Sequence, residues 1–306
     1  MENADKFFVE SSCVTKKETV YFVIAVILSA ILNLVFLGVS IITGLIIIVL
    51  YIVLIVLFMQ GLMIAHIQQN GVRITESQFP EIYEKVSNMA FKMAIPRTPA
   101  VYLMESGGCL NAFATRFACK NFVVLYSDIL ELAYEEGENA VDFIIAHELA
   151  HIKRNHMGKR VWTFWGELFP FLGTAYSRAC ETTCDNIATC MVNGDISEGL
   201  LLLLAGKKLY KKINIKNLLD SANNDYGVFA WFSEINSTHP HLSARVDNIL
   251  RMNKQMFDID SDLISQDYRF KMPVAAKVIM ALFVYIPIAL CFIGIILALT
   301  IPSFLS

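Results

Sequence analysis

The sequence predicts an α+β, predominantly helical domain with a small sheet, joined to transmembrane helices. The composition is 56% hydrophobic and 17% charged over 306 residues, which is unusual for a soluble protein. Residues 20–65 contain no Asp, Glu, Lys or Arg. Residues 66–272 have an ordinary charged content, and helical spacing dominates among their apolar positions.

The uncharged run 20–65 is long enough for two membrane spans. At about 1.5 Å per residue it measures roughly twice the hydrocarbon core of a bilayer. Glycine and small polar residues near its middle favour a turn, which gives predicted helices at Val20–Gly38 and Ile42–Ile64. A cleaved signal peptide is the alternative, but the run is too long and lacks a small-residue cleavage site.

A second uncharged stretch, Val278–Ser306, predicts a third span near the C-terminus. The predicted organisation is therefore an N-terminal cytoplasmic segment (1–19), a transmembrane hairpin (20–65), a globular domain (66–272) and a C-terminal transmembrane helix (273–306).

Basic residues predict the orientation of these spans in the cell membrane. They flank the hairpin and the last span on one side only, at Lys6, Lys16, Lys17, Arg269, Lys271 and Lys277. The positive-inside rule then places the globular domain in the cytoplasm of a multi-pass protein. Seven cysteines without a paired spacing agree with a reducing compartment. The net charge of −3 and the lack of a basic stripe argue against nucleic acid as a partner.

Within the globular domain the sequence predicts helices around a few short strands. Phe79–Met93 has apolar residues at helical spacing and ends before two prolines. Ala100–Met104 and Asn121–Tyr126 are predicted strands, and Asn111–Thr115 is another candidate. A helix is predicted at about Asn139–Asn155, and it carries the principal motif.

The segment His147-Glu148-Leu149-Ala150-His151 presents two imidazoles on one face of this helix, with a carboxylate on the adjoining arc. This spacing can supply two nitrogens to one tetrahedral zinc ion. A zinc-bound water has its pKa lowered towards about 7, and Glu148 is placed to take its proton.

A third protein ligand is expected downstream, where Glu181 and Asp185 share a helical face. Glu181 would complete a site of two histidines and one glutamate, and Asp185 would accept the free N–H of a ligand histidine. Cys180 or Cys184 is the rival ligand, because thiolates bind zinc well. The other interpretation is a solvated acidic face paired with Arg178.

With these residues the chain resembles the HtpX-like membrane metallopeptidases, HExxH zinc enzymes of the gluzincin type and relatives of the CaaX prenyl endopeptidases. The resemblance rests on four motifs in the family's order: Asn111–Thr115, His147–His151, Arg178 with Glu181 and Asp185, and Ser237-Thr238-His239-Pro240 followed by Arg245. It implies a zincin-like catalytic domain.

The resemblance also implies the roles of individual residues. One zinc ion per chain would be held by His147, His151 and Glu181, with Glu148 as general base and Asp185 behind the ligands. Asn111 and Ala112 would lie beside the cleft and pair with an extended substrate.

His239 precedes Pro240, which favours an extended conformation at the histidine. An imidazole presented at such a loop end could donate a hydrogen bond to the oxyanion of the tetrahedral intermediate. Arg245 is either a substrate contact or an ion-pair partner of Asp185 or Glu181.

The chain departs from the HtpX pattern between the histidines and the third ligand, where that family has two further spans. Here Val161–Tyr176 is aromatic but too short to cross a bilayer. We expect it to form an interfacial lip or to pack into the domain core.

The expected function is that of an integral-membrane zinc endopeptidase acting on peptides or membrane proteins at the lipid bilayer. The alternatives are a zinc-binding membrane chaperone or adaptor, and a prenyl-peptide protease of the CaaX type. A transporter is disfavoured because the predicted spans contain no Asp, Glu, Lys, Arg or His to form a translocation site.

Overall fold

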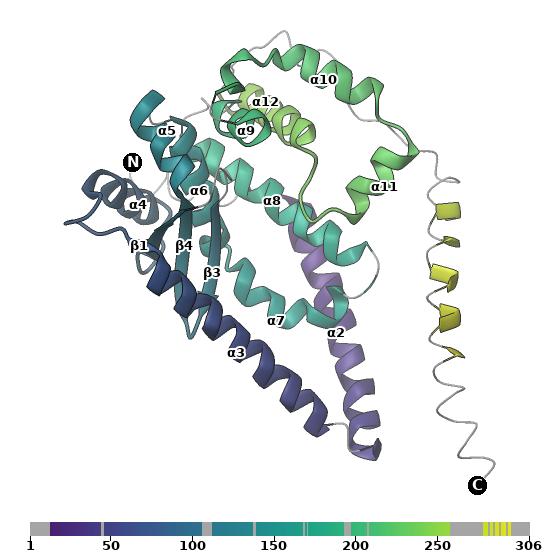
Figure 1. Ribbon diagram of the computed structural model, residues 1–306. Helices are drawn as coiled ribbons and strands as arrows, with labels where there is room; N and C mark the ends of the chain where they lie inside the picture. The colour runs from purple at the N-terminus through teal and green to yellow at the C-terminus, as the bar shows by residue number, and fades with distance from the viewer. Residues whose placement is uncertain are drawn as a thin grey trace.

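The computed structural model describes residues 13–257 apart from 44–45, 106–111, 137–138, 168, 170, 193–196 and 207, together with parts of 278–294. Helices dominate and a small mixed sheet lies at one end of the domain (Figure 1). The predicted α+β, predominantly helical class is therefore confirmed. The predicted C-terminal span lies mostly outside the described residues, and its described parts between Val278 and Cys291 are helical.

Two apolar helices, α2 (Lys16–Thr43) and α3 (Ile46–Asn70), are long enough to cross a membrane. Both extend beyond the uncharged run. Helix α2 starts early because Thr15 caps it, with Thr15 Oγ1 accepting from the Glu18 N–H at 3.3 Å. Helix α3 continues because Ile64 and Ile67 near its end are buried against the sheet.

The sheet has the strand order β1-β2-β4-β3 (β1 Val72–Arg73; β2 Ala100–Met104; β3 Ala112–Phe117; β4 Lys120–Tyr126). Strands β2 and β4 are parallel, whereas β1 pairs with β2 and β3 with β4 in antiparallel fashion. Successive side chains of β4 point to opposite faces of the sheet. Val123 and Leu125 join the main core, while Phe122 and Val124 contact the end of α3. Strand β3 is an edge strand of this sheet.

The remaining helices follow the chain order α4 Pro80–Lys92, α5 Ser127–Glu136, α6 Asn139–Lys153, α7 His156–Glu167, α8 Leu172–Met191, α9 Ser197–Ala205, the short 3₁₀ helix η1 Tyr210–Lys212, α10 Ile215–Asn224, α11 Val228–Asn236 and α12 Leu242–Phe257. Helix α6 is the centre of the main core. Its side chains Phe143, Ile145 and Leu149 are almost fully buried, so the position of this helix is fixed by packing.

Helix α7 lies against the first apolar helix. The Gly166 N–H donates to Ser29 Oγ at 2.7 Å, and a side chain at Gly166 would collide with the backbone of Ala25. The rings of Phe36 and Trp165 are 5.2 Å apart at their centroids. Small residues therefore let α2 and α7 approach closely, as in helix pairs of membrane proteins.

The aromatic segment Val161–Tyr176 thus packs on α2, forming most of α7 and the start of α8. Other side chains of α7 remain exposed, among them Val161, Phe164 and Trp162, the last with 68% of its surface accessible. These apolar side chains are next to a candidate membrane helix, which favours a place for α7 at the interface.

The fluorescence of Trp162 can be used to test whether α7 lies at the membrane interface. In proteoliposomes, a variant that retains Trp162 alone (Trp165→Phe, Trp231→Phe) is expected to be quenched by lipids brominated near the headgroup, because indoles at this level sit among headgroups. Unbrominated lipid is the reference, and a further Trp162→Phe change controls for background emission. Stronger quenching by acrylamide in the water than by brominated lipid would contradict an interfacial α7.

Candidate metal centre

The histidines of the predicted motif lie on one face of α6 and point towards α8. The Nε2 atoms of His147 and His151 are 3.3 Å apart. Their rings meet edge to face with centroids 5.1 Å apart. The buried apolar side of α6 fixes this face of the helix, so the two rings are presented together by the helix itself.

Helix α8 brings a carboxylate to both imidazoles. Glu181 Oε2 is 3.3 Å from His147 Nε2, and Glu181 Oε1 is 3.3 Å from His151 Nε2. One ligand atom from each residue lies within 4.8 Å of the others, close enough to hold one metal ion. The three residues that the sequence proposed as ligands are therefore brought together by the packing of α6 on α8.

The donor atoms fit a tetrahedral metal ion. Two ligands bound at about 2.0–2.1 Å with tetrahedral angles are about 3.3–3.4 Å apart. The two imidazole nitrogens are separated by this spacing, and each of them is 3.3 Å from a different carboxylate oxygen of Glu181. Two imidazole nitrogens and one carboxylate also leave a coordination position for a reactant.

Asp185 lies behind His147. Its Oδ1 atom is 2.9 Å from His147 Nδ1, and its side chain is 1% exposed. Arg245 forms a bidentate ion pair with it, through Nε to Oδ2 at 2.8 Å and Nη2 to Oδ1 at 2.6 Å. Burial favours the neutral acid, but Arg245 outweighs this effect and lowers the pKa of Asp185. The ionised Asp185 then faces Nδ1 of the His147 ring, whose Nε2 is directed towards Glu181.

The ion pair with Asp185 fixes the position of Arg245. Of the two roles that the sequence left open, the structure shows the ion pair with Asp185, in which the guanidinium is buried. A role of Arg245 in substrate binding stays a prediction.

The charge of the site favours a cation. Burial opposes an imidazolium at His147, but the carboxylates of Asp185 and Glu181 more than compensate and raise the pKa of His147 to about 10. A group that attracts a proton this strongly also attracts a metal ion, which competes for the same nitrogen.

Glu148 and His239 are close to this centre on different elements. Glu148 follows His147 on α6, and it is buried. His239 follows α11, and its Nδ1 atom is 3.0 Å from Glu181 Oε2 although its side chain is 61% exposed. His239 therefore lies at the open side of the site.

Arg178 of α8 holds the loop that carries His239. Its Nη1 atom donates to the carbonyls of Ile235 at 2.9 Å and Ser237 at 2.8 Å. The sequence offered Arg178 only as a partner of the acidic residues, and these backbone contacts were not predicted.

The rival ligands Cys180 and Cys184 are both buried. Burial raises the pKa of the Cys180 thiol to about 12 and that of Cys184 well above its usual value. Cys184 Sγ is instead 3.7 Å from His156 Nδ1, on the other side of His151. Among the described residues, Glu181 is the candidate third ligand that lies close to both His147 and His151.

The proposed substrate strand is described only in part. Asn111 lies outside the described residues. Ala112 opens the edge strand β3, opposite Leu125 of β4. The pairing of either residue with a substrate stays a prediction.

The comparisons with known proteins agree with the motif. Residues 76–169 match a family model described as Peptidase family M48. The match covers less than a third of the chain and contains the sheet strands β2–β4 and both histidines of α6, but ends before Glu181. It supports a metallopeptidase. No curated protein and no solved structure matches the chain.

Substitution of the third ligand separates the rival metal sites. Glu181→Ala is expected to lose bound metal, because it removes the carboxylate shared by both histidines. Cys180→Ala is expected to keep it. Elemental analysis of the purified proteins gives the metal content per chain. Retention by Glu181→Ala together with loss by Cys180→Ala would show that the thiol, and not the carboxylate, is the ligand.

The affinity for added Zn²⁺ is expected to rise with pH, because the metal must displace a proton from His147. In the metal-free protein this pKa is about 10, above its usual 6.5. The imidazolium therefore stabilises the metal-free fold below pH 6.5, and this contribution is lost as pH rises through about 10.

Competition with a chelator between about pH 7 and 9 should show an affinity increase approaching tenfold per pH unit. Asp185→Asn removes one source of the raised pKa and should flatten this slope. An equal slope in both proteins would contradict the assignment of the proton to His147.

Proposed function

We propose that the chain is an integral-membrane, zinc-dependent endopeptidase. The observation that carries the proposal is the convergence of His147, His151 and Glu181 at 3.3 Å spacings on two packed helices. Two nitrogens and one carboxylate are a ligand set typical of catalytic zinc in peptidases. The match to Peptidase family M48 supports the same reaction class.

A zinc ion in this site would polarise the scissile carbonyl and lower the pKa of a water molecule. Glu148, adjacent to the ligand His147, would take the proton of the attacking water and later deliver it to the leaving amine. His239 at the open side of the site would donate a hydrogen bond to the developing oxyanion. Asp185, held by Arg245, would keep His147 oriented throughout.

An extended polypeptide is the substrate that the sheet suits best. Strand β3 is an edge strand, and α6 packs beside it. A peptide added to such an edge is bound through its main chain, so many side-chain sequences can be accepted. We therefore propose β3, beginning at Ala112, as the binding strand.

The two apolar helices suggest where substrates are found. Helices α2 and α3 are long and apolar enough to cross a membrane, and their flanking basic residues favour a cytoplasmic peptidase domain. We propose misfolded membrane proteins or membrane-proximal peptides at the cytoplasmic face as substrates. We base this substrate class on the resemblance to HtpX-like enzymes. The kinship with CaaX proteases makes prenylated peptides the alternative substrate class.

Glu148→Gln distinguishes a peptidase from a zinc-binding adaptor. The amide is nearly isosteric but cannot act as a base, so we expect the zinc content to persist while hydrolysis falls by about 10²–10⁴-fold. Cleavage of membrane-protein substrates by the two proteins can be mapped by mass spectrometry. The matched control is Asp142→Asn, which changes a carboxylate on the same helix as Glu148 and breaks its ion pair to Lys85 of α4. Equal cleavage by wild type and Glu148→Gln would exclude the proposed mechanism.

A further inference from the structure

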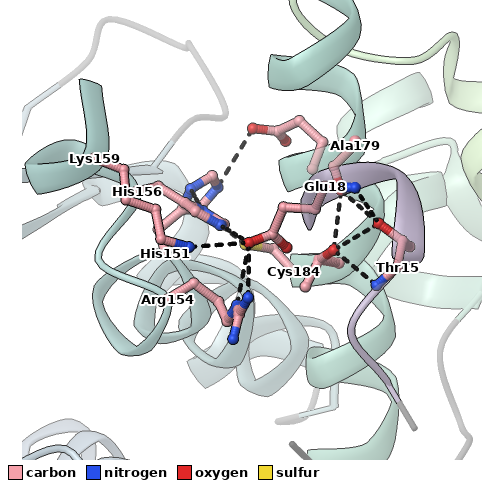
Figure 2. A network of polar contacts seen from close by, with 10 residues as sticks. Thr15, Glu18, His151, Arg154, His156, Lys159, Ala179 and Cys184 are labelled. Atoms are coloured by element: carbon pink, nitrogen blue, oxygen red, sulfur yellow. Dashed lines mark hydrogen bonds and ion pairs between the residues drawn. The ribbon is translucent and has the colours of Figure 1, made fainter. Parts of the chain in front are cut away.

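The candidate ligand His151 has a second ring nitrogen, Nδ1, which forms a hydrogen bond with His156. His156 has no part in the proposed hydrolysis. Figure 2 shows the chain of contacts that begins there. His151 Nδ1 is 3.0 Å from His156 Nδ1, and His156 Nε2 is 3.2 Å from Glu18 Oε1. His156 opens α7, whereas Glu18 belongs to the first turn of the apolar helix α2.

One arrangement of protons satisfies all of these contacts. If His151 Nε2 is left free to bind metal, its Nδ1 carries the hydrogen and donates to His156 Nδ1. His156 must then carry its own hydrogen on Nε2, which donates to Glu18. A neutral imidazole has one accepting and one donating nitrogen, so the His156 ring can make both contacts at once.

Glu18 is also held in place by two positively charged side chains. Its Oε1 atom accepts from Arg154 Nε at 3.2 Å and Nη2 at 3.0 Å, just beyond the end of α6. Lys159 Nζ of α7 is 3.3 Å away. The Glu18 side chain is almost fully buried, and such a carboxylate is tolerated only when it is paired in this way.

The start of α2 is also fixed to α8. Thr15 Oγ1 and Thr183 Oγ1 are 3.0 Å apart, and the Thr15 N–H donates to the same Thr183 oxygen at 3.3 Å. Cys13 Sγ is 2.7 Å from Cys190 Sγ. Helix α2 is therefore attached both to the helix that carries the third ligand and to the helix that follows the histidine motif.

A second metal ion is a poorer explanation of this cluster. Two groups of described residues here are close enough to hold one: Glu18, His156 and Cys180, and His151, His156 and Cys184. However, Arg154 and Lys159 already balance the charge of Glu18, and the Nδ1 atoms of His151 and His156 are already hydrogen-bonded to each other. The cluster is better explained as a support for His151.

We propose that His156 and Glu18 are positioning residues for the ligand His151, so that the first apolar helix is a structural part of the metal centre. The proposal rests on the proposed metal site. On this view each histidine ligand has its own support: Asp185 with Arg245 behind His147, and His156 with Glu18 behind His151. Such partners fix the ring orientation and the basicity of a ligand, and their loss costs about 10–100-fold in metal affinity.

Three substitutions in the full-length protein separate the two hydrogen bonds of His156. In His156→Asn the amide oxygen can take the place of Nδ1 and still accept from His151. In His156→Gln the amide nitrogen can take the place of Nε2, which keeps a donor for Glu18 but leaves the His151 N–H without its acceptor. Glu18→Gln keeps an acceptor for His156 and removes the charge.

Two readouts report on the metal ligands and not on turnover. They are the Zn²⁺ affinity, measured by competition with a chelator, and the visible spectrum of the Co²⁺-substituted protein. We expect His156→Gln to lower affinity by about 10–100-fold and to shift the Co²⁺ bands. His156→Asn should recover most of the affinity, and Asp142→Asn, which breaks an unrelated ion pair of α6, should leave both readouts unchanged.

A double-mutant cycle tests the link to α2. Glu18→Gln should weaken Zn²⁺ binding in the presence of His156 and add nothing in the His156→Gln background. Equal losses in both backgrounds, or unchanged affinity and spectrum in His156→Gln, would overturn the proposal. Retention of metal by His147→Ala and Glu181→Ala would instead show that the proposed metal site itself is wrong.

Discussion

The packing of α6 on α8 is the contact on which the rest of this structure depends. Helix α6 contributes both histidines and α8 contributes Glu181, so neither helix holds a metal site alone. The buried side chains Phe143, Ile145 and Leu149 fix α6 in the core, and this apolar packing sets the 3.3 Å separations between ligand atoms. A shift of one helix along the other by a single residue would move Glu181 by about 1.5 Å and separate it from the imidazoles.

The polar groups around this contact form two chains of hydrogen bonds and ion pairs that end in arginine. Asp185 connects His147 to Arg245 of α12, and His156 with Glu18 connects His151 to Arg154. Buried carboxylates are costly unless their charge is balanced, which explains why both chains end in a guanidinium. The site therefore draws on α2, α7 and α12 in addition to the two helices that carry the ligands.

The sequence predicted the parts of the site that depend on local spacing. His147 and His151 are recognisable because one helix places them together, and Glu181 and Asp185 because one further helix does the same. Contacts made by tertiary packing were not predictable in this way. Glu18 completes a capping-box pattern with Thr15, which suggests a local role, yet its side chain contacts His156. His156 lies shortly after the motif in the sequence. Its side chain reaches His151 because the chain turns between α6 and α7, and the sequence pattern does not show how this turn directs the side chain.

The position of Glu18 bears on how the apolar helices are understood. A helix that served only as an anchor would need no buried carboxylate, since apolar side chains suffice to hold it in a bilayer. In α2 the first turn instead carries a carboxylate that contacts α7 and the end of α6, while the turns beyond it expose apolar side chains. Tilting or withdrawing α2 would pull Glu18 away from His156 and leave both groups buried without their partner. The contact between Glu18 and His156 therefore ties the position of α2 to that of the candidate metal centre.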